Sequence, residues 1–176
     1  IVVGAGTGGT SATIGRYLRY HGCATQLCVV DPEHSVFYDH YLTRQPVQAG
    51  TAASGVEGIG RPRVEPSFLP DVIDRMIRVP TAASYAAMRL LARLTGKRYG
   101  GSTGTDFYGA LRLACEMRAA GQTGSVVLLA CDGGDRYLDT YYDDAWLARE
   151  GHDLSGPTRT LEAACATGVW QDEDGA

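Results

Sequence analysis

The fold of this chain is decided by its first stretch, Ile1-Val2-Val3-Gly4-Ala5-Gly6-Thr7-Gly8-Gly9-Thr10-Ser11. The β-branched residues at its start are typical of a buried central strand, and the glycines after them predict a tight turn. A helix is predicted from Ser11 to about His21, ended by Gly22, and a second strand from Gln26 to Val30. Strand, glycine turn, helix and strand form the unit that builds a parallel sheet, so the sequence predicts an α/β fold.

The remaining chain supplies further predicted elements. Residues 35–66 are rich in glycine, proline and polar side chains, which indicates a loop region. Beyond Trp146 the polarity rises, and we expect residues 151–176 to form a polar, loop-like tail with a disordered acidic end. The other predicted elements are helices over 70–76, 80–94 and 105–120 and a buried parallel strand over 125–130.

Composition argues against several classes of function. The 176 residues carry a net charge of −4, with 44% apolar and 20% charged residues, as in an ordinary globular domain. This charge offers no basic surface for nucleic acid, and no apolar run reaches the roughly 18 residues of a membrane span. We therefore expect a cytoplasmic protein that binds neither nucleic acid nor membrane. The five cysteines include no CxxC pair, so no metal site is predicted.

The glycine loop after the first predicted strand is the candidate anion site. Backbone N–H groups at the start of a helix, the helix dipole and the hydroxyls of Thr7 and Thr10 suit a phosphate group. We expect Gly8 and Gly9 to let the backbone approach that phosphate in conformations that a Cβ would oppose. The loop also fits the G-x-G-x-x-G pattern of dinucleotide-binding folds, with Asp31 about 20 residues further on. A nicotinamide-dependent Rossmann dehydrogenase therefore stays open as an alternative.

Four short motifs, in order along the chain, resemble those of the cysteine synthase and cystathionine β-synthase family of pyridoxal-phosphate enzymes. Gly6-Thr7-Gly8-Gly9-Thr10 resembles the family's phosphate loop, and Val56-Glu57-Gly58-Ile59-Gly60 resembles its VEGIG active-site loop. Gly101-Ser102-Thr103-Gly104 resembles its GSSG motif. Residues 132–138, DGGDRYL, resemble a D-S-G-x-R-Y-L run near the end of its catalytic domain. The dinucleotide hypothesis accounts for the first motif alone.

The resemblance implies pyridoxal 5′-phosphate as the cofactor and an open, twisted parallel sheet flanked by helices. This architecture is most of the large domain of the tryptophan synthase β-like fold, and residues 1–150 would be the C-terminal portion of the catalytic domain. Gly58, Ile59 and Gly60 would bind the substrate. The implied cofactor contacts are Gly6, Thr7, Gly8, Gly9 and Thr10 at the phosphate, Ser102 opposite the pyridine nitrogen, and Asp132.

The resemblance also concerns the lysine that forms the Schiff base with the cofactor. In the family it lies in a segment upstream of the phosphate loop, and we expect such a segment before Ile1 and no catalytic residue within residues 1–176. Lys97 is the only lysine of the chain. It follows Gly96 at the predicted end of a helix, where a cation more often interacts with the helix dipole. Lys97 is therefore not the predicted Schiff-base residue.

The implied reaction is a β-substitution on an O-activated serine, either O-phosphoserine or O-acetylserine. A sulfur nucleophile would replace the leaving group and yield cysteine or an S-substituted cysteine such as S-sulfocysteine. A neutral hydroxyl such as that of Ser102 opposite the ring nitrogen favours elimination at the β-carbon over transamination. The expected partners are an amino-acid substrate, a sulfur donor and a second copy of the chain in a homodimer. A non-catalytic relative of the family stays open as a further alternative.

Two arginines, Arg61 and Arg63, depart from the family's usual sequence after the VEGIG motif. Their forked guanidinium groups suit a phosphate or sulfonate of the substrate, because they can pair with two oxygens at once. Two solvated arginines on a surface loop remain the alternative. The leaving group and the sulfur donor are left open.

Overall fold

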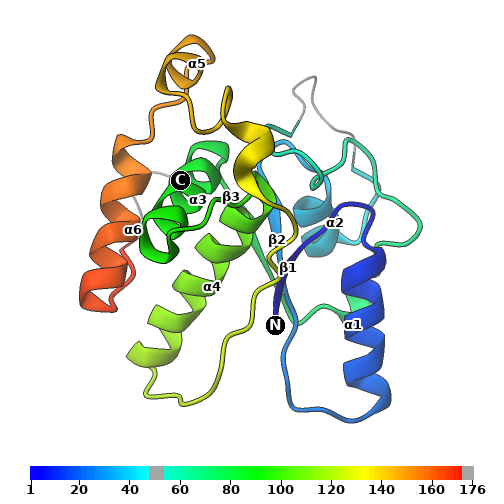
Figure 1. The fold of residues 1–176 in the computed structure, drawn as a ribbon. Helices are drawn as coiled ribbons and strands as arrows, with labels where there is room; N and C mark the ends of the chain where they lie inside the picture. The colour runs from blue at the N-terminus through cyan, green and yellow to red at the C-terminus, as the bar shows by residue number, and fades with distance from the viewer. Residues whose placement is uncertain (48–53, 172–176) are drawn as a thin grey trace. The chain divides into compact units, whose positions relative to one another are not determined.

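The computed structural model describes residues 1–47 and 54–171 (Figure 1). The chain divides after Thr81 into two compact units. Unit 1 contains β1 (Val2–Gly4), α1 (Gly9–Tyr20), β2 (Cys28–Pro32), α2 (Phe37–Thr43), the 3₁₀ helix η1 (Pro70–Val72) and β3 (Arg75–Val79). Unit 2 contains α3 (Thr81–Thr95), α4 (Gly101–Ala119), the 3₁₀ helix η2 (Gly134–Tyr137), α5 (Asp144–Arg149) and α6 (Ser155–Thr167). The first residue of α3 is the last residue of unit 1.

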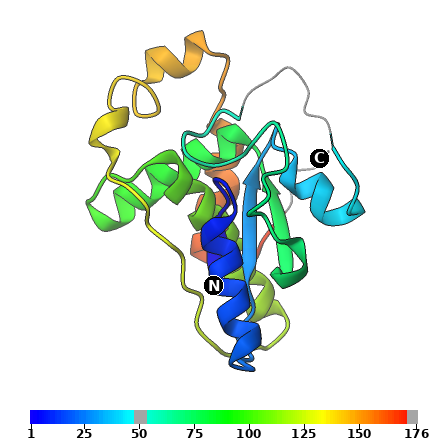
Figure 2. The ribbon, with the colours of Figure 1, turned by 90° about the vertical axis from the view of Figure 1, so that its right-hand side faces the viewer.

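The strands of unit 1 form a parallel sheet in the order β1-β2-β3. Val3 pairs with Val29, and Val29 pairs with Met76 on its other side. All five residues of β2 are buried, as expected for a central strand with both faces covered. Figure 2 shows α1 running beside this sheet. The α/β fold with a parallel sheet, predicted from the opening residues, is confirmed.

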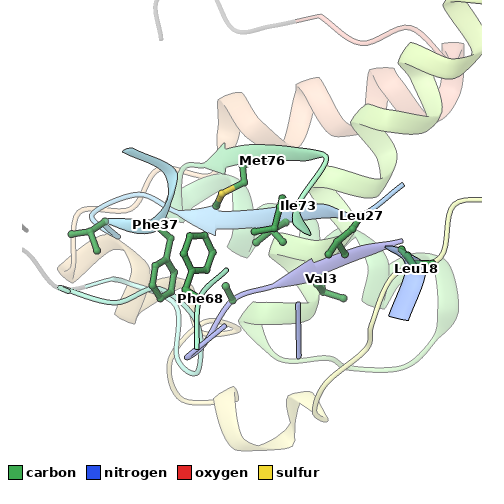
Figure 3. Packing of buried hydrophobic residues seen from close by; sticks show 10 residues of the cluster. Val3, Leu18, Leu27, Phe37, Phe68, Ile73 and Met76 are labelled. Atoms are coloured by element: carbon green, nitrogen blue, oxygen red, sulfur yellow. The ribbon is translucent and has the colours of Figure 1, made fainter. Parts of the chain in front are cut away.

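The hydrophobic core of unit 1 packs against the glycine loop. It contains buried side chains from β1, α1, β2, α2 and the segment before η1 (Figure 3). The rings of Phe37 and Phe68 stack with centroids 4.3 Å apart. Phe68 is 3% exposed, and its backbone lies directly against Gly8. The loop after β1 therefore packs against the stacked pair of aromatic side chains.

Unit 2 is helical, and its α4 and α6 pack together through a small apolar cluster. Leu161 and Ala164 of α6 are 0% and 1% exposed. The expectation of a loop-like tail after residue 151 is therefore wrong for residues 155–167, because the apolar side chains among the polar ones fall on one helix face. The expected disorder at the acidic end concerns residues 172–176, which lie outside the described residues.

Three further expectations differ from the structure. Residues 70–76, predicted as a helix, form η1 and the start of β3, because pairing with β2 buries Met76 and Ile77. The predicted loop region contains the helix α2. Residues 125–130 form no strand of the described sheet, and Val127 and Leu129 are exposed. Among the described helices, none has the length and apolarity needed to cross a membrane.

Candidate functional site

The start of α1 leaves several backbone donors free for a ligand. The first hydrogen bond of the helix runs from the Ala12 N–H to the Gly8 carbonyl, at 2.9 Å. The N–H groups of Gly9, Thr10 and Ser11 precede that bond, so the helix itself gives them no acceptor. No side chain caps this end, and the first turn contains no acidic residue. The positive end of the helix dipole is therefore open to an anion, which is the arrangement that binds phosphate groups.

Gly8 and Gly9 serve different purposes in this loop. Gly8 has a φ of +89°, and a Cβ there would lie 2.5 Å from the Phe68 Cα. Gly9 has no positive φ, and its added Cβ would meet only the Thr7 Oγ1, at 3.9 Å. The expectation that both glycines adopt conformations opposed by a Cβ therefore holds for Gly8 only. The space in front of Gly9 is open, which fits a bound phosphate.

The hydroxyl-bearing residues around the loop also have different roles, because one is buried and two are exposed. Ser11 is 1% exposed, and its hydroxyl donates to the Gly8 carbonyl at 3.0 Å, so it holds the turn together. Thr7 and Thr10 are exposed, and the carbonyl of Thr7 accepts a hydrogen bond from Ser67 at 2.6 Å. Ser67 was not predicted to matter. Thr7 and Thr10 are thus the hydroxyl-bearing residues placed to meet a ligand from solvent.

The second predicted motif lies against the glycine loop. The Gly60 N–H donates to the Ala5 carbonyl at 2.9 Å. A Cβ on Gly6 would approach the Gly58 carbonyl oxygen to 2.7 Å, so the two backbones are in close contact. Ile59, between the two glycines, is 6% exposed and turns its side chain into the protein. The structure therefore brings residues 4–10 and 56–60 together, and offers backbone rather than the Ile59 side chain to a ligand.

Arg61 and Arg63 occupy different environments. The Arg61 guanidinium donates to the Gly60 carbonyl at 3.0 Å, and its Nη2 lies 3.9 Å from the position of a Cβ on Gly6. Arg63 has a side chain that is 80% exposed and forms an ion pair with Glu65 at 3.1 Å. Arg61 therefore lies beside the glycine loop, whereas Arg63 points into solvent.

Unit 2 places Ser102 and Asp132 near the start of α4. Gly100 is the N-cap residue, so Ser102 lies within the first turn and is not itself the cap. Ser102 is 7% exposed. The Gly100 N–H donates to the Asp132 carbonyl at 3.1 Å, and the Asp132 carboxylate accepts a hydrogen bond from Tyr137 at 2.7 Å. The third and fourth motifs are therefore joined through the backbone at Gly100.

Cys131 is a residue of this region that the sequence did not single out. Its N–H donates to the Thr103 hydroxyl at 3.1 Å. Burial raises the pKa of the Cys131 thiol, as does the nearby Asp106, while a hydrogen bond with Ser102 lowers it. The thiol is therefore within hydrogen-bonding reach of Ser102. Its position just before the fourth motif was the only signal in the sequence.

Asp31, the acidic residue of the dinucleotide hypothesis, is used inside the protein. It is 0% exposed, and its carboxylate accepts the N–H of Tyr38, in the first turn of α2, at 2.9 Å. Burial raises its pKa to about 6, against opposing effects of Ser35, the Tyr38 N–H and Arg78. A carboxylate in this position is not available to a ribose hydroxyl. The geometry therefore removes the second element of the dinucleotide pattern.

Lys97 is exposed and follows Gly96, beyond the end of α3. In the described ranges, no three His, Cys, Asp or Glu side chains come together in a way that could hold a metal ion.

Comparison with known proteins gives a consistent result. A family model described as "Pyridoxal-phosphate dependent enzyme" matches residues 1–132. The chain is 56% identical to an L-cysteine desulfhydrase of Mycobacterium tuberculosis over 161 residues, which are 92% of this chain and 44% of that protein. It is 31% identical to cysteine synthase 2 of Schizosaccharomyces pombe, over 85% of this chain and 40% of the relative. It is 30% identical to a cystathionine beta-synthase of Apis mellifera, over 86% of this chain and 29% of the relative. The chain thus spans less than half the length of each of these relatives.

Proposed function

The chain belongs to the family of pyridoxal-phosphate dependent enzymes, and from this premise we propose that its protein is a desulfhydrase that eliminates sulfide from L-cysteine. In this reaction L-cysteine and water give pyruvate, ammonia and hydrogen sulfide. The 56% identity to an L-cysteine desulfhydrase over 92% of this chain carries the choice of substrate. The open N-terminus of α1 supports the choice of cofactor, because its free N–H groups and dipole suit a phosphate.

In this proposal the glycine loop anchors the cofactor. The N–H groups of Gly9, Thr10 and Ser11 and the hydroxyls of Thr7 and Thr10 bind its phosphate, while Gly8 lets the loop turn above Phe68. Pyridoxal phosphate, when bound, supplies an electron sink for bond breaking at the α- and β-carbons of the substrate. Ser102 is proposed to face the pyridine nitrogen with a neutral hydroxyl, and Asp132 holds the backbone before α4.

The loop over residues 56–60 is proposed to bind the substrate. This is supported by its contact with the glycine loop, because the Gly58 carbonyl and the backbone around Gly60 lie beside the residues proposed to bind the phosphate. Arg61 extends the same surface with a guanidinium group, which can pair with an anionic group through two hydrogen bonds. The exposed Arg63, already paired with Glu65, is given no role in binding.

A second candidate function is the β-substitution expected from the sequence, with O-phosphoserine as the amino-acid substrate. The position of Arg61 favours it, because a guanidinium beside the site matches a phosphate leaving group better than the uncharged thiol of cysteine. In that reaction sulfide or thiosulfate replaces the phosphate at the β-carbon. O-acetylserine would gain little from Arg61, since its ester offers no pair of anionic oxygens.

The two functions are separated by assaying the complete, cofactor-loaded protein. We expect L-cysteine alone to give sulfide and pyruvate in equal amounts, with a kcat/KM above that for cysteine formation from either O-activated serine and sulfide or thiosulfate. Preferred synthesis of cysteine or S-sulfocysteine would overturn the desulfhydrase proposal. A protein that binds the cofactor but turns over none of these substrates would be a non-catalytic relative.

The role of Arg61 is tested with a matched pair of variants, Arg61→Gln and Arg63→Gln. Each removes one cation from the same segment. If Arg61 binds a phosphate, its variant should lower kcat/KM for O-phosphoserine by about tenfold to a hundredfold, the effect of losing a hydrogen bond to a charged group. Arg63→Gln should change it by less than about threefold, as for an exposed ion pair. Equal losses for O-phosphoserine and O-acetylserine would contradict the proposed contact.

A further inference from the structure

A pocket at the C-terminal end of α3 has no part in the function proposed above. It belongs entirely to unit 2 and has a volume of about 740 Å³. Pockets that bind small molecules span roughly 300–1,000 Å³, so this one has room for a ligand of that size. The charged and aromatic side chains that line it are Arg89, Arg93, Lys97, Arg98, Asp135 and Tyr142.

Positive charge in this pocket is only partly compensated. Four of the lining side chains are cationic, and Asp135 is the only acidic residue among them. Two of these cations are neutralised from outside the lining, since Arg89 pairs with Asp144 and Arg93 pairs with Glu162. Asp135 is 90% exposed, and its carboxylate comes no closer than 3.9 Å to Arg98. Over the described ranges, Lys97 forms no ion pair. The pocket therefore presents more positive charge than its own carboxylate neutralises.

Arg89 adds a donor that still lacks an acceptor. Its Nε donates to the Tyr141 carbonyl at 2.8 Å, and its Nη1 pairs with Asp144. Its Nη2 is buried and has no hydrogen-bond partner among the described atoms. Buried donors are almost always satisfied in folded proteins, so an unpaired one in the wall of a pocket indicates a missing partner.

The C-terminal dipole of α3 explains part of this cation cluster. A helix end carries about half a negative charge, and cations in the last turn offset it. A single cation would be sufficient for that purpose, whereas two of the four lining cations, Lys97 and Arg98, have no carboxylate closer than 3.9 Å among the described residues. The excess points to a ligand with more than one negative charge, and arginine forks match phosphate oxygens in pairs.

The wall of the pocket is held in place by hydrogen bonds that do not depend on a ligand. The Tyr142 hydroxyl accepts the N–H of Tyr99 at 3.1 Å and donates to its carbonyl at 3.0 Å. The carbonyl of Arg98 accepts the Gly134 N–H at 3.1 Å. Such a wall loses little freedom on binding, which favours affinity. We propose that this pocket binds a small molecule carrying a diphosphate or triphosphate group.

The proposal is tested by calorimetric titration of the complete, cofactor-loaded protein with inorganic pyrophosphate and tripolyphosphate at fixed ionic strength. The bound cofactor occupies the glycine loop of unit 1, so that loop does not compete for the added anion. We expect saturable binding of one anion per chain. The Lys97→Gln/Arg98→Gln double variant should bind it at least about tenfold more weakly, because two contacts to a charged ligand are lost.

The matched control is the Arg16→Gln/Arg159→Gln double variant, which removes two exposed cations from α1 and α6. It should bind pyrophosphate as the wild type does, and thermal unfolding should show that both variants are folded. Absence of saturable binding in the wild type, or equal weakening in both variants, would overturn the proposal. The readout is binding alone, so the result is independent of whether the protein is a desulfhydrase.

Discussion

The difference between Gly8 and Gly9 gives the sharpest test of the phosphate site. The changes are Gly8→Ala and Gly9→Ala, which add the same methyl group at adjacent positions of the loop. At Gly9 the methyl meets only the Thr7 hydroxyl, at 3.9 Å, and needs no unusual backbone conformation. At Gly8 it meets the Phe68 backbone at 2.5 Å and the backbone has a φ of +89°. The two variants should therefore fail in different ways.

The expected magnitudes follow from these contacts. Gly9→Ala lies at the start of α1 and should leave the free energy of unfolding unchanged or raise it by up to about 1 kcal/mol, since alanine favours helices. Gly8→Ala carries the left-handed conformation, which costs about 1–2 kcal/mol, as well as the collision with Phe68. Its free energy of unfolding should fall by at least about 2 kcal/mol.

Gly9→Ala should weaken cofactor binding even though it leaves the folded protein stable. We expect its methyl to enter the space in front of the free N–H groups and to displace a phosphate from at least one of them. A lost hydrogen bond to a charged group is worth about 1.5–3 kcal/mol, so pyridoxal phosphate should bind about tenfold to more than a hundredfold more weakly. Gly9→Ala is thus expected to be a stable protein with a poor cofactor site.

Two measurements on the complete protein decide the matter. Urea unfolding of the cofactor-free form gives the stability, and titration with pyridoxal phosphate, followed by its visible absorption, gives the affinity. If Gly9→Ala bound the cofactor as tightly as the wild type, the phosphate would not lie against the start of α1. If instead Gly8→Ala were as stable as the wild type, the packing of Phe68 under the loop would be wrong.

Three further predictions concern Asp31, Ser102 and Lys97. Burial raises the pKa of Asp31 from 3.8 to about 6, so the stability of the wild type relative to Asp31→Asn should fall as the pH rises through this window, by up to about 3 kcal/mol. Urea unfolding at several pH values measures the difference, and parallel profiles would contradict the burial argument. Ser102→Asp should retain the cofactor but shift the products formed from L-cysteine toward transamination, because a carboxylate would hold a proton on the ring nitrogen. An unchanged product pattern would show that Ser102 does not face that nitrogen. Lys97→Arg should leave the cofactor's visible band intact, since Lys97 is exposed beyond α3, and loss of the band would make Lys97 the Schiff-base residue.

The first part of the fold could be predicted because its signals are local. β-Branched residues, a glycine turn and a helix ended by Gly22 lie next to one another in the sequence, and β1, α1 and β2 follow them closely. β3 carries a weaker local signal, since Pro70 suggests the start of a helix and Arg75 and Arg78 interrupt the apolar residues. Its conformation is decided by pairing with β2, which is a contact between distant segments.

The opposite error occurred at residues 125–130. Their apolar run has the composition of a buried strand, but a strand also needs a neighbour that can accept and donate its backbone hydrogen bonds. The described residues of unit 2 provide no such strand, and Val127 is 60% exposed. In α6 the average polarity concealed the spacing of Leu161 and Ala164, which determines the buried face of the helix. Composition alone thus misjudged both segments.

For the site, the sequence identified the motifs but not their contacts. The contact between residues 4–10 and 56–60 depends on the close approach of Gly6 to the Gly58 carbonyl, which leaves no trace in either motif alone. Ser67 and Phe68, which support the loop, lie in a segment without a recognisable pattern. These residues act through tertiary packing, so only the folded chain reveals them.

The two arginines show most clearly why position in the sequence is not position in the site. In an extended segment, residues two apart point to the same side, so Arg61 and Arg63 would be expected to face the same environment. The segment is not extended: the chain turns at Gly60, whose φ is +77° and whose N–H donates to the Ala5 carbonyl, and it bends again at Pro62 and Arg63. Beyond this turn Arg61 stays beside Gly6, whereas Arg63 turns to Glu65. An alanine at position 60 would meet Pro32 at 2.7 Å and oppose that turn. Both arginines would remain in the sequence, but the contact between Arg61 and the glycine loop would be lost.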